Sequence, residues 1–256
     1  MLRFWKRKRQ PTLIHFTHAK AGSTWIDGIL REVFGRRVRG RSWGVPEFHQ
    51  SVGSVFPSVF MRRDEALEIP EVQAAQRFFV LRDLRDTLVS RYFSIRESHK
   101  PDPAGKIERE RCILRSMGVE EGLIHCMEEV GMMQTAEIQQ SWLGSGEIVL
   151  RYEDLLARDV ALLSELFNGQ LRLELDPEKL ESAVTSQRFE NVYQRKLGEE
   201  DVSSHGRKGT PGDWQNHFTP RLAQHFEKLY GSLLLAGGYA RDASWAHAVG
   251  ARPHGG

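Results

Sequence analysis

Runs of apolar residues alternate along this chain with stretches whose apolar positions recur every three to four residues. Three runs, at residues 12–17, 77–81 and 147–151, are short and lack polar alternation, which is typical of strands buried on both faces. A helical pattern follows each of them. Strands that alternate with helices predict an α/β fold of three layers, with a central, mainly parallel sheet flanked by helices.

The rest of the pattern predicts a single domain over residues 12–240, with a substrate insert or lid at about 97–133. Residues 1–11 are basic and are expected to form a flexible leader, and residues 241–256 are expected to form a disordered tail. The stretch 42–59 mixes apolar residues with Gly and Pro, so we expect one short strand among irregular loops there. Helices are expected over 24–34, 64–75 with a break at Pro70, 106–143, 152–166, 176–183 and 220–235.

Composition and charge narrow the classes of function. The chain has 256 residues, 27% of them charged, and a formal net charge of +2 at pH 7. That charge is too mild to predict nucleic-acid binding, but it suits a small anionic ligand. The spacing of Cys112 and Cys126 indicates neither a metal site nor a redox pair. No stretch of about 18 apolar residues occurs, and no apolar signal core follows the basic leader, so a cytoplasmic protein without a membrane span is expected.

The first polar cluster follows the first predicted strand at residues 18–25, which read His-Ala-Lys-Ala-Gly-Ser-Thr-Trp. A strand, a short loop and a helix N-terminus direct free backbone N–H groups and the positive end of the helix dipole at one point. Lys20 adds a full positive charge, and Ser23 and Thr24 can cap the helix or bind an anion. The cluster predicts a P-loop-like phosphate site, although its lysine precedes the glycine, unlike the G-x-x-x-x-G-K-[ST] order.

Two further clusters supply cations. Arg82 ends the second predicted strand, eight residues before Ser90 on the next helix, and arginine suits the planar, bidentate capture of a phosphate. Arg207, Lys208 and Gly209 follow one another in a glycine-rich loop, where Gly209 allows close approach of the backbone. Each cluster alone is equally well explained by a surface turn, a solvated charge run or a linker. Together they predict two phosphate sites, as for a nucleotide with phosphates at both ends of its ribose.

These motifs resemble those of the PAPS-dependent sulfotransferase family, where PAPS is 3′-phosphoadenosine 5′-phosphosulfate. Four blocks stand in the family's order: Lys20-Ala-Gly-Ser-Thr-Trp25, Arg82-Asp-Leu-Arg-Asp-Thr-Leu-Val-Ser90, Tyr152-Glu-Asp-Leu155, and Arg207-Lys-Gly-Thr-Pro-Gly-Asp-Trp214 with Asn216-His217-Phe218-Thr219. The resemblance implies a P-loop-like nucleotide-binding core and PAPS as co-substrate, with no metal expected. It also implies in-line transfer of a sulfuryl group to a hydroxyl or amine, with release of the bisphosphate PAP.

The resemblance implies a role for each matched residue. The 5′-phosphosulfate would be held by the loop residues Lys20, Ala21, Gly22, Ser23 and Thr24. The 3′-phosphate would be held by Arg82, Ser90, Arg207, Lys208 and Gly209. The adenine would be contacted by Trp25, Tyr152 and Ser186, with Phe189 nearby; core packing is the alternative for Trp25 and Phe189. Lys20 would also neutralise charge on the bridging oxygen of the departing nucleotide, which makes it the expected catalytic cation.

The general base is where the chain departs from the family pattern. Cytosolic members carry a Lys-Thr-His about twenty residues before the arginine of the 3′-phosphate motif, whereas residues 60–64 here read Phe-Met-Arg-Arg-Asp. Other branches use a glutamate on the segment after the first helix, where this chain has Glu47 and His49. Either side chain could take a proton from an acceptor hydroxyl, and Asp64 is a further candidate.

Two rival functions remain open on the sequence. One is a small-molecule kinase of P-loop type, and the other is a nucleotide-binding module without catalysis, which the absent histidine favours. The acceptor is expected to be a small molecule or a glycan. The family's dimer motif of Lys, then Thr-Val, then Glu is replaced here by Gln215, Thr219-Pro220 and Gln224, so the resemblance leaves open whether the chain forms a homo-oligomer.

Overall fold

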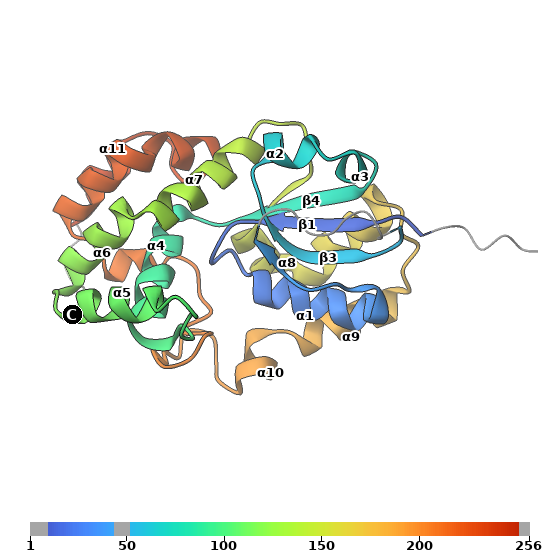
Figure 1. Ribbon diagram of the computed structural model, residues 1–256, viewed down its shortest axis with the longest axis horizontal. Coiled ribbons are helices and arrows are strands. Elements are labelled where there is room, and N and C mark those ends of the chain that lie inside the picture. Colours follow the sequence, from blue (N-terminus) through green and yellow to red (C-terminus); the bar gives the residue numbers. More distant parts are fainter. Residues whose placement is uncertain (1–9, 44–51, 251–256) are drawn as a thin grey trace, which may run out of the picture.

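The computed structural model describes residues 10–43 and 52–250, which form a five-stranded parallel sheet with helices on both faces (Figure 1). The strand order is β2-β3-β1-β4-β5, so the first long strand lies at the centre. β1 pairs with β3 on one side and with β4 on the other, and all pairings are parallel. The strands are β1 Leu13–Thr17, β2 Ser42–Trp43, β3 Val55–Phe60, β4 Gln76–Leu81 and β5 Val149–Arg151.

The α-helices divide into three groups. One face of the sheet is covered by α1 Ser23–Phe34, α8 Tyr152–Ser164 and α9 Pro177–Ser186. The short helices α2 Arg63–Leu67 and α3 Pro70–Gln73 lie on the other side with the end of α7 Val130–Trp142. A helical lobe beside the sheet contains α4 Leu84–Phe93, α5 Lys106–Arg115, α6 Val119–Glu128 and α11 Pro220–Ala236, and α10 Phe189–Tyr193 and α12 Ser244–Ala248 are short.

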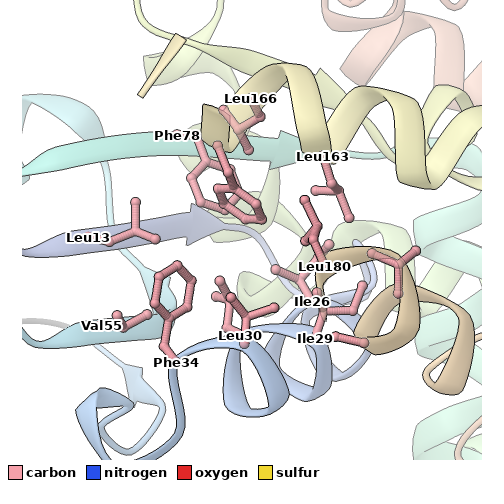
Figure 2. Close-up of a cluster of buried hydrophobic side chains, with 14 of the residues drawn as sticks. Leu13, Ile26, Ile29, Leu30, Phe34, Val55, Phe78, Leu163, Leu166 and Leu180 are labelled. Atoms are coloured by element: carbon pink, nitrogen blue, oxygen red, sulfur yellow. The ribbon is translucent and has the colours of Figure 1, made fainter. Parts of the chain in front are cut away.

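The core between the sheet and α1 positions the loop that follows β1. The apolar face of α1 carries Ile26, Ile29 and Leu30, each at most 1% exposed, which pack against strand residues and against α8 and α9 (Figure 2). Complete burial of such a side chain contributes about 1.5–3 kcal/mol. The start of α1 is therefore fixed relative to the end of β1 by packing along the whole helix.

The opposite face of the sheet is held by Trp142 at the end of α7. Its ring stacks on Phe79 at 5.3 Å and lies 4.5 Å from the ring of Phe16. Its indole N–H donates to the carbonyl of Met61 at 3.0 Å, which satisfies the polar end of a fully buried aromatic side chain. These contacts attach the end of α7 to β1 and β4.

The segment 97–133, predicted as an insert, forms α5 and α6 and leads into α7. Leu123, Cys126 and Met127 of α6 are fully buried in the same cluster as the apolar residues of α4 and α11. Gly122 makes this packing close, because a Cβ there would stand 2.5 Å from the ring of Tyr92. Movement of this segment as a lid remains a prediction.

The α/β fold class predicted from the sequence is confirmed, but two details of the pattern are wrong. The stretch 42–59 is expected to hold one short strand, but two strands of the sheet begin in it, β2 and β3. β3 has six residues, is buried throughout and is hydrogen-bonded to the central strand. Pro57 and Ser58 interrupt its apolar pattern, and Pro57 is accommodated beside an irregularity in the pairing between Ile14 and Phe16.

The second wrong detail is the tail expected from residue 241. Residues 244–248 form α12, and Trp245 packs edge-on against Trp214 with ring centroids 5.6 Å apart. Its indole N–H donates to Glu227 on α11. A helix of one turn anchored by a single tryptophan leaves no periodic signal, which explains the difference. Among the residues described, no helix combines the length and the apolar character that crossing a membrane requires.

Candidate active site

The loop between β1 and α1 has the backbone of an anion cradle. Lys20 and Gly22 both have positive φ, 67° and 80°, and α1 begins at Ser23 without a side-chain cap on its first N–H groups. These N–H groups are donors without intrahelical partners, at the positive end of the helix dipole. Gly22 is required for a second reason, because a Cβ there would stand 2.7 Å from the ring of Tyr152.

His18 joins this loop to the end of β4. Its Nε2 accepts from the backbone N–H of Arg82 at 3.1 Å, and its Nδ1 lies 2.9 Å from the carbonyl of Ala19. Burial, together with the charge of Arg82, lowers the pKa of His18 to about 4, although the hydrogen bond to Ala19 opposes the shift. The ring is therefore neutral at pH 7, and it holds two strand ends together with a fixed tautomer.

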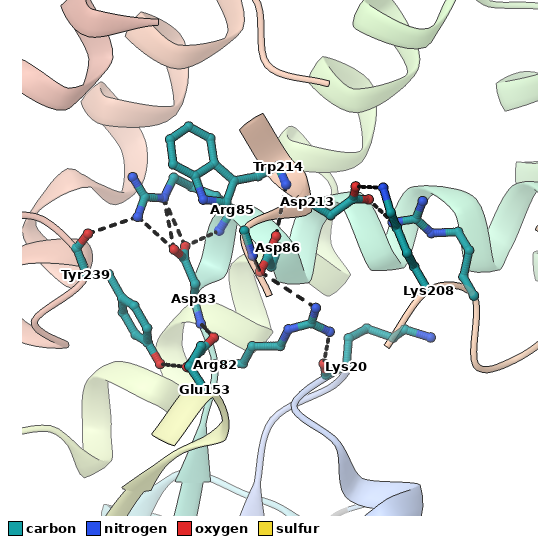
Figure 3. Close-up of polar contacts among 12 residues, drawn as sticks. Lys20, Arg82, Asp83, Arg85, Asp86, Glu153, Lys208, Asp213, Trp214 and Tyr239 are labelled. Atoms are coloured by element: carbon teal, nitrogen blue, oxygen red, sulfur yellow. Dashed lines mark hydrogen bonds and ion pairs between the residues drawn. The ribbon is translucent and has the colours of Figure 1, made fainter. Parts of the chain in front are cut away.

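Arg82 lies across the loop. Its Nη1 donates to the carbonyl of Lys20 at 3.1 Å (Figure 3). Its guanidinium lies 4.8 Å from the ring centroid of Tyr152. Its Nη2 is 3.8 Å from Asp86, a long contact for an ion pair. The Nε atom is buried and has no hydrogen-bond partner in the part of the chain that the structure describes. Arg82 therefore keeps unused donor capacity at the end of β4.

Lys20 lies among cations that come from three segments. Burial and, after it, the charges of Arg82, Arg91 and Arg207 lower the pKa of Lys20 from 10.5 to about 8. Within residues 10–43 and 52–250, no carboxylate forms an ion pair with Lys20. A lysine without a described counter-ion favours the binding of an anion. The bound anion would raise the pKa of Lys20 toward its usual value and keep the side chain protonated.

The loop that carries Arg207 and Lys208 is organised by Asp213. The carboxylate of Asp213 accepts from both cations, from Asn216 at 2.8 Å and from His217 at 3.2 Å. Burial raises its pKa, but these hydrogen bonds outweigh burial and hold the pKa well below its usual range. The two cations are thus already paired within their own loop.

Asp86 on α4 attaches the loop that carries Arg207 and Lys208 to the helix that follows Arg82. Its carboxylate accepts from the backbone N–H of Gly212 at 2.6 Å and from that of Trp214 at 2.9 Å. Arg85 stacks on Trp214 with its guanidinium 4.0 Å from the ring centroid, and it pairs with Asp83 at 2.7 Å (Figure 3). These contacts hold the second cationic loop against the first helical turn after Arg82.

The three aromatic residues predicted around the adenine lie in two places. Trp25 and Tyr152 pack edge to face with centroids 6.0 Å apart, and the indole N–H of Trp25 is buried without a partner among the described residues. The ring of Phe189 packs on Gly209, where a Cβ would stand 2.6 Å away and φ is 74°. Ser186 instead is exposed and donates to Glu32 at 2.8 Å.

The remaining predicted residues are placed unequally. Ser90 is half-buried on α4, and Thr24 is half-buried at the start of α1, with its hydroxyl 3.2 Å from Nε2 of His205. Glu47 and His49, the predicted bases, lie outside the described residues. Lys20, Arg82 and Tyr152 are brought together, whereas Ser186 contacts α1 instead.

Three polar residues near the site were missed from the sequence. Arg91 follows Ser90 directly, and its charge lowers the pKa values of Lys20 and His99. The Lys20 charge also contributes to lowering the pKa of His205 to about 4, after burial. Arg91 and His205 stand one and two residues from matched motif positions, so inspection of motif flanks could have found them.

A separate cavity of about 350 Å³ lies at the opposite end of β1 from these cations. Its lining includes Pro11 before the strand and Phe34 at the end of α1. Arg37 in its wall already donates to the carbonyls of Pro11 and Gly53. The cavity is therefore distinct from the cationic site, which is at the carboxyl ends of the strands, where α/β sheets bind ligands.

Comparison with known proteins gives consistent results. A family model described as a sulfotransferase domain matches residues 74–238. The chain is 23% identical over 245 residues to the 3-alpha-hydroxysteroid sulfotransferase of Cavia porcellus, which covers 85% of this chain and 81% of that protein. It is 28% identical over 172 residues to sulfotransferase 2A2 of Rattus norvegicus, covering 61% of this chain and 55% of that protein.

Solved structures share the fold at low sequence identity. Mouse sulfotransferase SULT7A1 complexed with PAP superposes with a TM-score of 0.61 at 14% identity, covering 88% of this chain and 85% of that chain. Retinol dehydratase in a complex with retinol and PAP gives a TM-score of 0.52 at 13% identity, covering 88% and 82% of the two chains. At such identities these structures establish the architecture of the sheet and helices.

Proposed function

The chain belongs to the sulfotransferase domain family, and we propose that it transfers a sulfuryl group from PAPS to a hydroxyl or amine of an acceptor and releases PAP. The observation that carries the proposal is the geometry around Lys20, where α1 begins without a side-chain cap and Arg82 donates to the Lys20 carbonyl at 3.1 Å. Burial and the charges of Arg82, Arg91 and Arg207 also lower the pKa of Lys20 to about 8. A ligand with two phosphate groups would supply the missing negative charge. Relatives named as sulfotransferases and neighbours complexed with PAP support this choice.

The residues present fit such a nucleotide. Free N–H groups at the start of α1 and the Nζ of Lys20 would hold the 5′-phosphosulfate. The buried, unpartnered Nε of Arg82 marks donor capacity for the 3′-phosphate, with Ser90, Arg207, Lys208 and Gly209 completing that site. The buried N–H of Trp25, also unpartnered among described residues, lies beside Tyr152, where we propose the adenine binds.

Bound PAPS would supply the sulfuryl group, whose bond to the bridging phosphate oxygen breaks while a new bond to the acceptor oxygen or nitrogen forms. Lys20 neutralises the negative charge that develops on the departing nucleotide. Arg82 orients the Lys20 loop through its bond to the Lys20 carbonyl. His18 stays neutral and buried, so its role is to hold the strand ends rather than to move a proton.

The acceptor must lose a proton during transfer, and we propose that Glu47 or His49 accepts it. These residues stand on the segment where some family branches place a catalytic glutamate. The test is the transfer rate of Glu47→Gln and His49→Ala, each measured separately. A fall of tenfold or more in one variant supports that residue as base, and a smaller change in both overturns the assignment. If both assignments are overturned, the transfer rates of His99→Ala and His205→Ala are measured next. Burial and the charge of Lys20 lower the pKa of both histidines, so either could be neutral and accept the proton.

The acceptor class and the location of the protein complete the proposal. We propose a small-molecule or glycan acceptor, in keeping with relatives named for hydroxysteroids. We also propose a cytoplasmic location, because Cys112 and Cys126 are both free thiols, as is usual in a reducing compartment.

Calorimetric titration with PAP, ATP and ADP tests the nucleotide assignment. We expect PAP to bind tightly without magnesium and ATP to bind negligibly. Tight, magnesium-dependent ATP binding would overturn the assignment and favour the kinase rival. Turnover of PAPS with a panel of phenols, alcohols and sugars tests the chemistry. PAP binding with no transfer to any member of the panel would favour a nucleotide-binding module without catalysis.

A further inference from the structure

No contact with the nucleotide is assigned to Arg91, although its charge adds to the positive potential at Lys20. It stands on α4 one residue after Ser90, and its side chain is 19% exposed. Its charge lowers the pKa of Lys20 and that of His99. Arg91 is also carried by α4, the helix that begins two residues after Arg82 and bears Ser90 of the proposed 3′-phosphate site.

The beginning of α7 holds Arg91 in place without saturating it. Gly131 leaves room for the guanidinium, because a Cβ there would stand 2.3 Å from Nη2. Among the described residues, Arg91 forms an ion pair with Glu129 at the long distance of 3.9 Å. Its Nε atom is buried and has no hydrogen-bond partner in the described part of the chain. Arg91 is thus a fixed donor with hydrogen-bonding capacity to spare.

Glu129 is a weak counter-ion for Arg91, because its carboxylate is also close to His125. Its second oxygen lies 3.8 Å from Nε2 of His125, and His125 is bound at 2.6 Å by Glu110. Glu129 therefore pairs only weakly with Arg91, whose Nε keeps no partner among the described residues. A guanidinium that is only weakly paired favours binding of an oxyanion.

Positive charge also surrounds His205, which stands two residues before Arg207. The charges of Lys20, Arg41 and Lys100 contribute to lowering the pKa of His205, whose ring lies 3.2 Å from the hydroxyl of Thr24. Arg41 is paired with Asp27 at 2.9 Å. A neutral acceptor would leave the donors of Arg91 unused in this environment, whereas an anionic acceptor would pair with them.

We propose that Arg91 binds an oxyanion of the acceptor, such as a carboxylate, and thereby selects anionic acceptors over neutral ones. The proposal rests on the proposed function, because it concerns the acceptor of the same transfer. Arg91 is the specificity-determining residue, and Glu129 is a positioning residue that acts through it. The guanidinium can engage a carboxylate through two parallel N–H donors, a geometry that lysine does not reproduce.

The test compares acceptors that differ only in charge. We would measure kcat/KM with PAPS for 4-hydroxyphenylacetate against its methyl ester, and for a 3-hydroxysteroid carboxylic acid against its methyl ester. The wild-type protein is expected to prefer the acid of each accepted pair by about tenfold or more, the size of one charge-assisted hydrogen bond. In Arg91→Met the ratio should fall close to one, and Arg91→Lys should restore part of it.

Two further variants separate a specific role from a structural one. Arg96→Met is the matched control, because Arg96 lies on the next turn and its guanidinium donates to the hydroxyl of Tyr92 at 2.7 Å. The acid-to-ester ratio should not change in this variant. Glu129→Gln should raise KM for the acid more than it lowers kcat, since it loosens the positioning of Arg91.

The outcomes separate the two proposals. A wild-type ratio near one, or an equal loss for acid and ester in Arg91→Met, would overturn the assignment of Arg91 while leaving sulfuryl transfer intact. Absence of PAP binding would instead overturn the proposed function. If PAP binds but no probe turns over, calorimetric binding of acid and ester to the PAP-loaded protein decides the question. Preference for the acid that depends on Arg91 supports the proposal, and equal binding contradicts it.

Discussion

The two anion-binding regions of this protein are built in opposite ways. The loop after β1 depends on local backbone: a positive φ at Lys20 and Gly22, and the uncapped start of α1. The loop at residues 205–214 depends on side-chain carboxylates, with Asp213 binding its cations and Asp86 fixing its backbone. In the first region Lys20 has no described counter-ion. In the second region Asp213 already pairs with Arg207 and Lys208.

The difference predicts how each region responds to a ligand. Lys20 has a lowered pKa and gains a counter-ion when an anion binds. Arg207 and Lys208 must share or release Asp213 before they engage a phosphate fully. We therefore expect the first region to contribute more binding free energy and the second to contribute position.

Removal of Lys20 should give the largest effect. In Lys20→Ala we expect kcat to fall by about 10² to 10³, the usual cost of removing one donor to a developing negative charge. Far-ultraviolet circular dichroism and the unfolding midpoint should stay close to those of the wild type. Lys228→Ala is the control, since Lys228 is exposed on α11. Near wild-type transfer by Lys20→Ala would show that the lysine has another role.

Arginine substitutions in the two regions compare the regions directly. Arg82→Ala should weaken PAP binding about 10- to 100-fold, because a partly unpaired guanidinium is lost. Arg207→Ala should weaken it about tenfold or less, because Asp213 is released to pair with Lys208 alone. Calorimetry of both variants measures the difference. An equal or larger loss in Arg207→Ala would contradict the contrast between an open and a neutralised region.

Asp86→Asn tests the attachment of the second loop. The substitution keeps one acceptor oxygen but loses the carboxylate that accepts from Gly212 and Trp214. We expect the free energy of unfolding to fall by about 1–3 kcal/mol, as for a buried charge-assisted hydrogen bond, and PAP affinity to fall with it. Urea unfolding measures the first effect. Asp64→Asn, an exposed carboxylate on α2, should leave stability unchanged, and unaltered stability of Asp86→Asn would show that the loop is fixed by other contacts.

Comparison of sequence with structure shows which features are encoded locally. The loop around Lys20 and Gly22 was predictable because a glycine and a helix start are local signals. The strand β3 was not, since Pro57 hides its pattern and burial between β1 and β2 is a tertiary effect. Arg91 was missed for the same kind of reason. Its place beside Ser90 could have marked it as a candidate, but its setting depends on Glu129 and on the absence of a side chain at Gly131, which are tertiary contacts.

The central claim, that Lys20 lacks a counter-ion until a nucleotide binds, is tested by the pH dependence of PAP affinity. The free lysine has a pKa of about 8, lowered by burial and by neighbouring arginines. Bound phosphate should raise it, so binding above pH 8 takes up a proton.

Calorimetry from pH 7 to pH 10, with Lys20→Gln as reference, is the measurement that tests this claim most directly. The account predicts that PAP affinity of the wild type falls by about tenfold per pH unit above pH 8, relative to the variant. A wild-type affinity that stays parallel to that of Lys20→Gln up to pH 10 would contradict it.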